Sequence, residues 1–337
     1  MAVYTHLNLE ELNTIASTYG LGKVESFKLL SGGSENSNFL ISTPAGIPSE
    51  RGLPSEQGQN QTLEQEGLVT QGQAFVITIC EQKTLEEASQ LARLLQLLKT
   101  HGFKSSEVVL AETGSAITLW QGKPVMVKHY LEGKIMEFLP AHLLTALGRE
   151  LGRLHQIPVP DYLPRQLSYG LEYFQEVADY AAASDFHHWL IAQQAYISPY
   201  LTETLPRALI HSDVFFSNVI VNEAETEAII MDFEEASNYY RLFDLGMTIV
   251  GLCRRGNAID SVMVKALLAG YQEEIELTAV EEGSLQAMTV YAATAMCFWR
   301  HRQFNQLQPD PAMFEHYRAL QETADFVRSM NEDAFKR

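Results

Sequence analysis

The stretch "ALIHSDVFFSNVIV", residues 208–221, places three polar side chains between two apolar runs. His211, Asp213 and Asn218 lie where one predicted strand ends and the next begins. Asp and Asn are common turn formers, so the loop alone predicts only a strand–turn–strand unit with His211 in the core. The segment "IIMDFEEA" changes this interpretation, because Asp232 ends the returning strand. A hairpin would bring Asp232 close to Asn218.

These residue types suit one kind of chemistry. A carboxylate and an amide oxygen that converge on one point form a site for Mg²⁺, which prefers carboxylates, waters and phosphates. Asn218 and Asp232 are the predicted metal ligands, and Asp213 is the predicted base that orients a hydroxyl for attack on phosphorus. Phosphoryl transfer from ATP requires these three parts, so the pattern predicts ATP and Mg²⁺ as cofactors.

The two motifs "HSDVFFSN" and "IIMDFEEA" together resemble those of the aminoglycoside phosphotransferase and choline kinase superfamily, which has a protein-kinase-like fold. The segment 1–43, above all "GSENSNF" from Gly33 to Phe39, resembles the bacterial homoserine kinases of that superfamily. The resemblance covers nearly the whole chain except residues 44–73. It implies an ATP-dependent phosphotransferase with an alcohol acceptor, first of all L-homoserine in threonine biosynthesis.

The resemblance also implies the roles of the motif residues. Asp213 would be the base, Asn218 and Asp232 would hold Mg²⁺, and His211 would brace the loop. In this superfamily the aspartate that corresponds to Asp244 often braces the same loop, although Asp244 is also an acidic candidate for the substrate cation.

A turn of small residues is the candidate for binding the ATP phosphates. Where side chains are absent, backbone N–H groups can approach phosphate oxygens. Without the resemblance, the same residues would be read as an ordinary hairpin turn. The turn consists of Ser31, Gly32, Gly33 and Ser34.

One position departs from the superfamily. Kinases of this fold usually carry a phosphate-binding lysine in the strand "FVITIC", where Thr78 stands here. Homoserine kinase-like sequences share that threonine. Lys83 after the strand, or Lys28 before the turn, would then supply the cation. The missing lysine leaves open a catalytically silent, kinase-like binding protein.

The substrate pocket needs an anion for an ammonium group and a donor for a carboxylate if the acceptor is homoserine. Glu234 and Glu235 follow the predicted metal ligand and are candidates for the ammonium. Arg302, or its neighbour Arg300, is the candidate for binding the carboxylate with its planar guanidinium.

The segment "DFEEASNYYRLFDLG" instead resembles choline and ethanolamine kinases. A cationic alcohol without a carboxylate would suit an acidic pocket and cation–π contacts with Tyr239, Tyr240 and Trp299. A choline or ethanolamine kinase, or another kinase of the superfamily, is therefore the alternative.

The distribution of elements predicts an α+β, two-lobed, protein-kinase-like fold. Residues 1–130 are rich in strands and form the predicted nucleotide-binding lobe, with a flexible insertion at 44–73 that is poor in apolar residues. Residues 131–337 form a larger, mainly helical lobe for catalysis and substrate binding. The predicted helices span about 9–19, 84–101, 140–156, 169–182, 185–203, 241–254, 260–275, 280–304 and 311–332.

The amino-acid composition limits which partners and which cellular compartment we expect for this protein. The 337 residues carry a formal charge of −18, which argues against a surface that follows nucleic-acid phosphates. The apolar runs fall short of a membrane span, and the N-terminus shows no secretory pattern. The 3 cysteines are far apart in apolar surroundings, which is typical of reduced thiols. We therefore expect a cytoplasmic protein with a small-molecule partner, no membrane or nucleic-acid partner, and an undefined oligomeric state.

Overall fold

The computed structural model describes residues 5–30, 36–44 and 72–335. The chain forms two compact units. The first contains the residues up to Gln96 and the segment Ser106–Tyr130, and the second contains Leu97–Ser105 and the residues from Leu131 onward. The predicted α+β class is confirmed, because an antiparallel sheet precedes a mainly helical part. Residues 45–71 of the predicted insertion lie outside the described residues.

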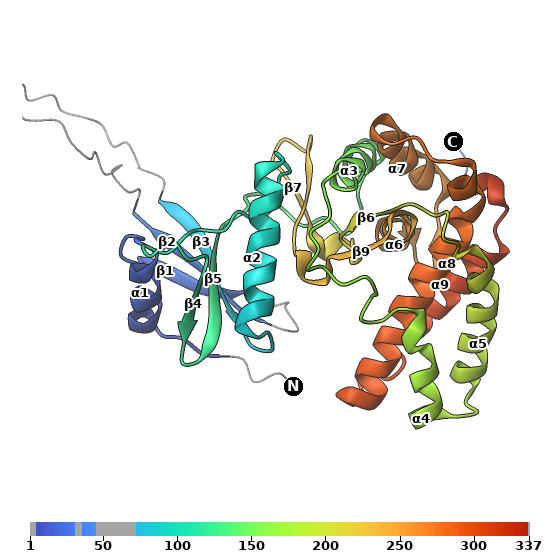
Figure 1. Cartoon of the computed structure of the whole chain (residues 1–337), viewed down its shortest axis with the longest axis horizontal. Coiled ribbons are helices and arrows are strands. Elements are labelled where there is room, and N and C mark those ends of the chain that lie inside the picture. The colour runs from blue at the N-terminus through green and yellow to red at the C-terminus, as the bar shows by residue number, and fades with distance from the viewer. Residues whose placement is uncertain (1–4, 31–35, 45–71, 336–337) are drawn as a thin grey trace, which may run out of the picture. The chain divides into compact units, whose positions relative to one another are not determined.

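The first unit is built around a five-stranded antiparallel sheet with strand order β1-β2-β3-β5-β4. Figure 1 shows α1 and α2 on opposite sides of this sheet. Its elements are α1 (Leu9–Thr18), β1 (Ser26–Leu30), β2 (Asn36–Thr43), β3 (Gln73–Cys80), α2 (Leu85–Thr100), β4 (Ile117–Trp120) and β5 (Lys123–His129).

Both helices of this unit begin with the same capping arrangement. Asn8 and Glu11 form a reciprocal capping box at α1. At α2 the Thr84 hydroxyl accepts from the backbone N–H of Glu87, whose carboxylate accepts from the backbone N–H of Thr84. Each box satisfies two of the donors that a helix start leaves unpaired. The apolar face of α1 then packs on alternate residues of the strands, such as Ile41.

The second unit is mainly helical and contains three short two-stranded sheets among the described residues. Strands β7 and β8 form a hairpin, and β6 pairs with β9. Its elements are α3 (Ala141–Leu154), α4 (Val177–Ala181), α5 (Asp185–Ile197), β6 (Arg207–Ile210), β7 (Val219–Val221), β8 (Ala228–Ile230), β9 (Ser237–Tyr240), α6 (Arg241–Leu252), β10 (Arg254–Arg255), β11 (Ala258–Ile259), α7 (Ser261–Glu274), α8 (Ala279–Arg302) and α9 (Arg318–Ser329).

Three local features differ from the sequence-based expectation. Residues 311–317 form turns closed by hydrogen bonds between residues three apart, such as that from the Met313 N–H to the Asp310 carbonyl, and α9 begins only at Arg318. Strand β9 was not expected, since "SNYY" shows no apolar alternation and gains its pairing from β6. Residues 97–105 belong to the second unit, where Ser105 donates to the carbonyl of Ile230 at 2.9 Å.

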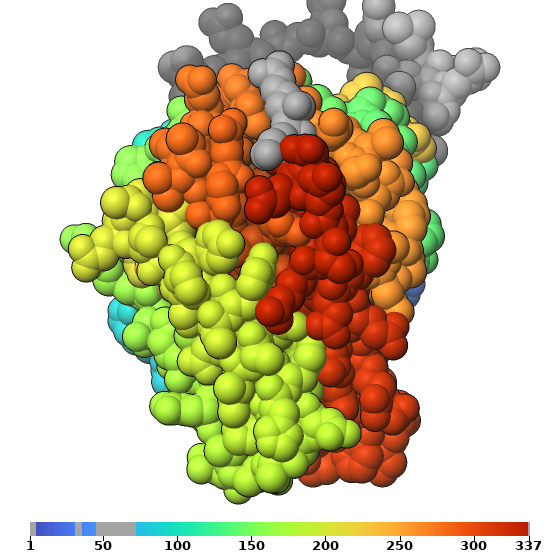
Figure 2. Space-filling model, turned by 90° about the vertical axis from the view of Figure 1, so that its right-hand side faces the viewer, coloured from blue at the N-terminus to red at the C-terminus, as the bar shows by residue number. Residues whose placement is uncertain are grey.

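Helices α5 and α9 cover one surface of the second unit, where they lie side by side (Figure 2). Both Trp189 and Gln193 on α5 donate to the carboxylate of Asp325 on α9, at 2.9 and 2.7 Å. These bonds fix the register of the two helices around the apolar core formed with α8. Within the described residues, no helix has the length and apolar character needed to cross a membrane.

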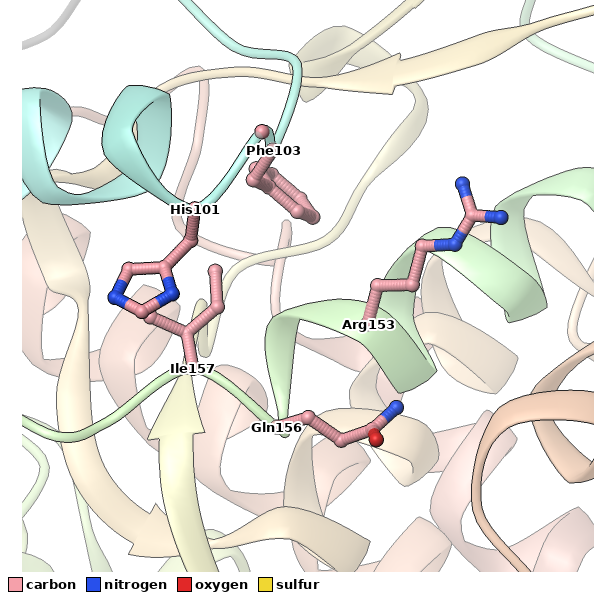
Figure 3. Close-up of a pocket in the computed structure, with 6 residues that line it drawn as sticks. His101, Phe103, Arg153, Gln156 and Ile157 are labelled. Carbon is pink, nitrogen blue, oxygen red and sulfur yellow. The ribbon is translucent and has the colours of Figure 1, made fainter.

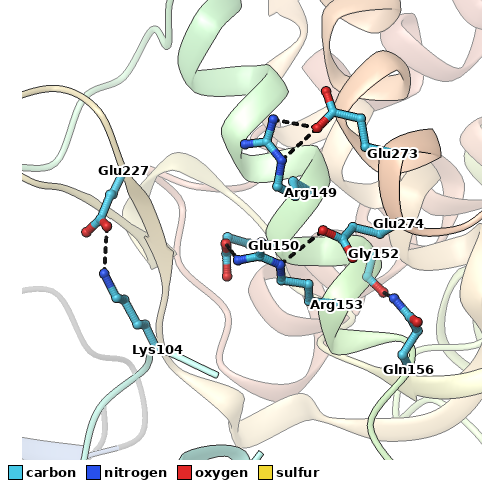
Figure 4. A network of polar contacts seen from close by, with 9 residues as sticks. All are labelled: Lys104, Arg149, Glu150, Gly152, Arg153, Gln156, Glu227, Glu273 and Glu274. Atoms are coloured by element: carbon cyan, nitrogen blue, oxygen red, sulfur yellow. Dashed lines mark hydrogen bonds and ion pairs between the residues drawn. The ribbon is translucent and has the colours of Figure 1, made fainter. Parts of the chain in front are cut away.

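Helices α3 and α7 pack at backbone distance because glycines line their contact. A Cβ added at Gly148 would lie 2.1 Å from the carbonyl oxygen of Leu267, and one at Gly270 would lie 1.9 Å from that of Thr145. Ion pairs border the seam, among them Arg149 with Glu273 at 2.6 Å. Figure 4 shows these pairs at the exposed rim, where they contribute little to stability. The close approach therefore depends on the glycines.

This seam predicts opposite effects for two glycine-to-alanine substitutions in helix interiors. Gly270→Ala forces the backbones of α3 and α7 apart and should lower the free energy of unfolding by about 3 kcal/mol. Gly283→Ala meets nothing within 4 Å and should raise it by about 0.5–1 kcal/mol. Urea denaturation followed by circular dichroism measures both. Similar changes in the two variants would contradict this account of the seam.

Candidate active site

The β7–β8 hairpin brings the ends of the two sequence motifs together. Val219 pairs with Ile230, and the backbone N–H of Met231 donates to the carbonyl of Asn218 at 2.9 Å. Asp232 is the next residue along the returning strand. The predicted proximity of Asp232 and Asn218 is confirmed by this register.

Asn218 and Asp213 are joined by hydrogen bonds within the loop. The Asn218 Nδ2 group donates to Asp213 Oδ2 at 3.0 Å and to the Asp213 carbonyl at 2.8 Å. Both acceptors are oxygens, so the amide must present its nitrogen to Asp213 and its oxygen elsewhere. The arrangement fixes one carboxylate oxygen of Asp213 and leaves Asn218 Oδ1 as an acceptor.

The loop is held from below by the side chain of Asp244 on α6. This side chain has 0% exposure, and its two oxygens accept the backbone N–H groups of His211 at 2.8 Å and Ser212 at 2.7 Å. His155 Nε2 lies 3.1 Å from the same carboxylate, and Tyr271 lies 2.8 Å from His155 Nδ1. These contacts agree with the expected bracing role of Asp244.

His211 connects the loop to the returning strand. Its Nδ1 accepts the backbone N–H of Asp213 at 3.2 Å, so in the neutral ring the proton is on Nε2. Nε2 lies 2.9 Å from the carbonyl oxygen of Met231 and donates to it. The ring also packs edge-on against Phe233 with a centroid distance of 4.7 Å. His211 thus spans the two motifs, as expected for a bracing residue.

Two residues of the site have left-handed backbones. Ser212 has a φ of 66° and Asp232 a φ of 69°. Asp is among the non-glycine residues that adopt this region most readily, although some strain remains. The turn at Asp232 ends the strand and starts the short 3₁₀ segment Phe233–Glu235. It therefore sets the direction of the predicted metal ligand.

The carboxyl group of Asp213 has an altered acidity. Its pKa is raised from 3.8 to about 7, first by burial and then by the charges of Asp232 and Glu235, against the hydrogen bond from Asn218 and the charge of Arg300. Such a pKa is suited to a group that gains and loses a proton near neutral pH. The charges of Glu235 and Arg300 therefore both act on this carboxyl group.

The donors at the hairpin fit a magnesium ion. Asn218 Oδ1 and the exposed carboxylate of Asp232 are hard oxygens, and Mg²⁺ binds through one or two such groups with waters and phosphates. The described residues contain no cluster of three or more His, Cys, Asp or Glu side chains able to hold a metal alone. A site that the substrate phosphates complete is the arrangement these donors allow.

The residues proposed for the substrate lie in the second unit. Glu235 accepts a hydrogen bond from the Ser168 hydroxyl at 2.9 Å, and Glu234 precedes it in the same 3₁₀ segment. Arg302 donates to Glu176 at 3.1 Å and to the Ser168 carbonyl at 3.0 Å. These contacts engage two of the three guanidinium nitrogens of Arg302.

The residues proposed to bind ATP belong to the first unit, and some of them are not among the described residues. Ser31, Gly32, Gly33 and Ser34 fall in residues 31–35, which lie outside the described residues. Thr78 is buried, as expected for an inward position, and donates to Asn38 at 2.7 Å.

Neither lysine candidate is singled out by the geometry. Lys28 stands on the exposed strand β1. Lys83 is half-buried, and its charge helps to lower the pKa of Glu87, after the larger effect of the hydrogen bonds from Thr84.

A pocket of about 240 Å³ lies elsewhere in the second unit (Figure 3). Figure 3 shows His101 and Phe103, which follow α2, opposite Arg153 and Gln156 at the end of α3. None of the residues predicted to act in catalysis lines it.

Several residues that support the site have no signal in the sequence. His155 caps α3 in "LGRLHQI", and Tyr169 donates to the carbonyl of Ser212 at 2.6 Å. Both are remote from the motifs, so only the fold brings them to the loop. Arg254, in the basic pair "CRR" that follows an apolar helix, was also missed, although a charged pair at that position is a recognisable signal.

The comparisons with known proteins define the class. Residues 59–282, more than half of the chain, match the phosphotransferase enzyme family, so the chain belongs to that family. It is an ATP-dependent phosphotransferase, and the resemblance stated above is confirmed.

Individual relatives and solved structures show which members of the family this chain is similar to. The chain is 27% identical over 335 residues to the homoserine kinase of Pseudomonas aeruginosa (strain UCBPP-PA14), with 94% of this chain and 95% of that protein covered. An amicoumacin kinase in complex with AMP-PNP and Ca²⁺ has the same fold, with a TM-score of 0.70, 16% identity and 97% of each chain covered. A microcompartment-associated aminopropanol kinase also shares the fold, with a TM-score of 0.68, 14% identity and coverages of 98% and 99%.

The charge environment of Asp213 gives a measurable prediction. In the metal-free protein its carboxyl should titrate near pH 7 in a ¹³C NMR titration, with Asp213→Asn used to assign the resonance. Glu235→Gln removes a negative neighbour and should lower that pKa, because ionisation then meets less repulsion. Glu315→Gln, on an exposed side chain, is the control and should leave it unchanged. A carboxyl that titrates near its ordinary value of 3.8 would refute this electrostatic description.

Proposed function

We propose that the protein is a homoserine kinase that transfers the γ-phosphate of ATP to the hydroxyl of L-homoserine. The observation that carries this proposal is the similarity to a homoserine kinase over 94% of the chain, combined with the Asp213–Asn218 pair beside Asp232. The similarity supports the substrate, and the pair supports the chemistry.

In this proposal Asp213 performs the proton chemistry. Its carboxylate accepts a hydrogen bond from the acceptor hydroxyl, orients the oxygen toward the γ-phosphorus and takes up the proton as the new bond forms. The pKa of about 7 makes the group basic enough to accept a proton while it is still ionised in part at neutral pH. The hydrogen bond from Asn218 holds one carboxylate oxygen of Asp213, so the other oxygen would face the substrate.

Asn218 Oδ1 and the Asp232 carboxylate would hold Mg²⁺. When bound, the ion neutralises phosphate charge and so favours transfer. The chain itself holds the two ligands close, because the β7–β8 register and the His211–Met231 bond tie the two motif arms together. Asp244 then fixes the position of the loop, because its carboxylate accepts hydrogen bonds from the backbone N–H groups of two loop residues, His211 and Ser212.

ATP would be bound by the first unit in this proposal. Ser31, Gly32, Gly33 and Ser34 would approach the phosphates through their backbone N–H groups, and Lys83 would supply a positive charge. Glu234 and Glu235 would bind the substrate ammonium. Cytoplasmic location and a place in threonine biosynthesis follow from the same proposal.

The structure offers less support for a choline or ethanolamine kinase. The Arg207 guanidinium lies 5.2 Å from the ring centre of Tyr239 and 4.7 Å from that of Tyr240. An aromatic face that already carries a cation is a poor site for a quaternary ammonium. Trp299 packs edge-on against Phe304, with a centroid distance of 6.1 Å.

A substrate panel tests the proposed function directly. ADP release is measured with Mg²⁺-ATP and homoserine, choline, ethanolamine, threonine or an aminoglycoside. We expect homoserine to have the highest kcat/KM of the panel. Turnover of another alcohol alone would reject homoserine, and the absence of both turnover and Mg²⁺-dependent ATP binding would indicate a silent, kinase-like binding protein.

A single variant tests the base. Asp213→Asn should lower kcat by about 100- to 10,000-fold, the usual contribution of general base catalysis, while ATP affinity changes little. The kcat/KM of the wild-type enzyme should fall as the pH drops below about 7, because protonation removes the base, and the variant should lose this dependence. A variant with a rate near that of the wild type would mean that the base lies elsewhere.

A further inference from the structure

Two arginines of the second unit lie near Asp213 without an acidic partner. Arg254 forms β10 directly after α6, and Arg300 belongs to the last turn of α8. Both side chains are half-buried. Among the described residues, neither forms an ion pair with an acidic side chain, and Arg254 Nη1 is buried with no hydrogen-bond partner. Buried polar groups are normally paired, so an unpaired guanidinium nitrogen needs an explanation.

Backbone packing brings Arg254 to the catalytic loop. A Cβ added at Gly251, in the last turn of α6, would lie 2.2 Å from the carbonyl oxygen of Val214 and 3.1 Å from Cα of Phe215. The end of α6 therefore touches the residues that follow Asp213. Arg254 comes three residues later, so it leaves the helix next to this loop.

Arg300 is held in the same region from the other side. Its Nη1 donates to the carbonyl of His316 at 3.3 Å, which leaves the rest of the guanidinium available. The pKa of Arg300 is lowered to about 10, first by burial and then by the positive charge of Arg254, while the negative charge of Asp213 opposes both effects. The charges of Arg254 and Asp213 thus both act on Arg300, and the two arginines repel each other.

Such a pair is unfavourable unless an anion joins it. Two like charges removed from water lose solvation and repel each other, and no described acidic side chain forms an ion pair with either of them. Two planar guanidinium groups offer several donors in fixed geometry, which matches the two oxygens of a carboxylate. Homoserine carries its carboxylate a few bonds from the hydroxyl that Asp213 would bind, so one small molecule can reach both.

We propose that Arg254 and Arg300 together bind the α-carboxylate of the acceptor amino acid and so select homoserine over amino alcohols that lack a carboxylate. This inference rests on the proposed function. Arg302 differs from the pair because it has an acidic partner, Glu176 at 3.1 Å, and also donates to the Ser168 carbonyl, although its Nε is likewise buried without a partner. Its charge is therefore already balanced, whereas neither arginine of the pair forms an ion pair with a described acidic group.

The test compares homoserine with 3-aminopropan-1-ol, which is homoserine without its carboxylate. Arg300→Gln and Arg254→Gln should each raise the KM for homoserine by about 10- to 100-fold, the range expected for charged hydrogen bonds. Kinetics with 3-aminopropan-1-ol and the KM for ATP should change less than about twofold, since neither involves the lost contact. If 3-aminopropan-1-ol is not turned over, its inhibition constant against homoserine replaces its KM.

Controls separate this inference from folding and from the proposed function. Arg318→Gln removes an exposed arginine paired with Glu315 and should leave all constants unchanged. Arg300→Lys keeps the positive charge but loses the planar guanidinium that can bind both carboxylate oxygens. This variant should therefore retain the fold and still show a raised KM for homoserine. A wild-type enzyme inactive with homoserine would reject the proposed function. If the wild type is active but the glutamine variants lose activity equally with homoserine and with 3-aminopropan-1-ol, only the proposed role of the arginine pair is rejected. The same holds if the variants show a raised KM for ATP alone, which would indicate that the arginines bind phosphate.

Discussion

The site depends on one buried carboxylate. Asp244 is fully enclosed, yet it remains among hydrogen-bond donors because two backbone N–H groups of the catalytic loop and a histidine ring point at it. A buried carboxylate without such partners would be strongly destabilising, so the loop and the aspartate require each other. The left-handed turn at Ser212, directly before Asp213, is held in place by this bond pair. His155 and Tyr271 extend the same network to α3 and α7.

The regular elements could be predicted where the sequence carries local rules. The starts of α1 and α2 could be predicted, because Asn8 is a common N-cap residue and because Thr84 and Glu87 have the spacing of a capping box. Strand β9 and the delayed start of α9 could not be found in this way. The first depends on pairing with β6, and the second on a series of turns before Arg318 that the apolar pattern does not reveal.

The residues of the site show the same difference between features set by local sequence and features set by tertiary packing. The proximity of Asn218 and Asp232 followed from a hairpin, which is a local structure, and the register bears it out. Arg254 and Tyr169 approach the loop only through packing of helices distant in sequence, so no spacing rule identifies them. The glycines of the α3–α7 seam belong to the same class, since a glycine in a helix is visible in the sequence while the carbonyl that it faces is not.

The left-handed backbone at Asp232 bears on how such a site changes over evolutionary time. Most side chains, and β-branched ones above all, are strained in this conformation, whereas Asn, Asp and Gly tolerate it. The steps open to this position are therefore few, and the easiest ones, to Asn or Gly, remove the negative charge and leave the turn intact. If Asp232 is the metal ligand that we propose, a lineage can lose metal binding here by a single substitution and keep a well-folded protein, which would place a kinase-like protein without catalysis one step from this chain.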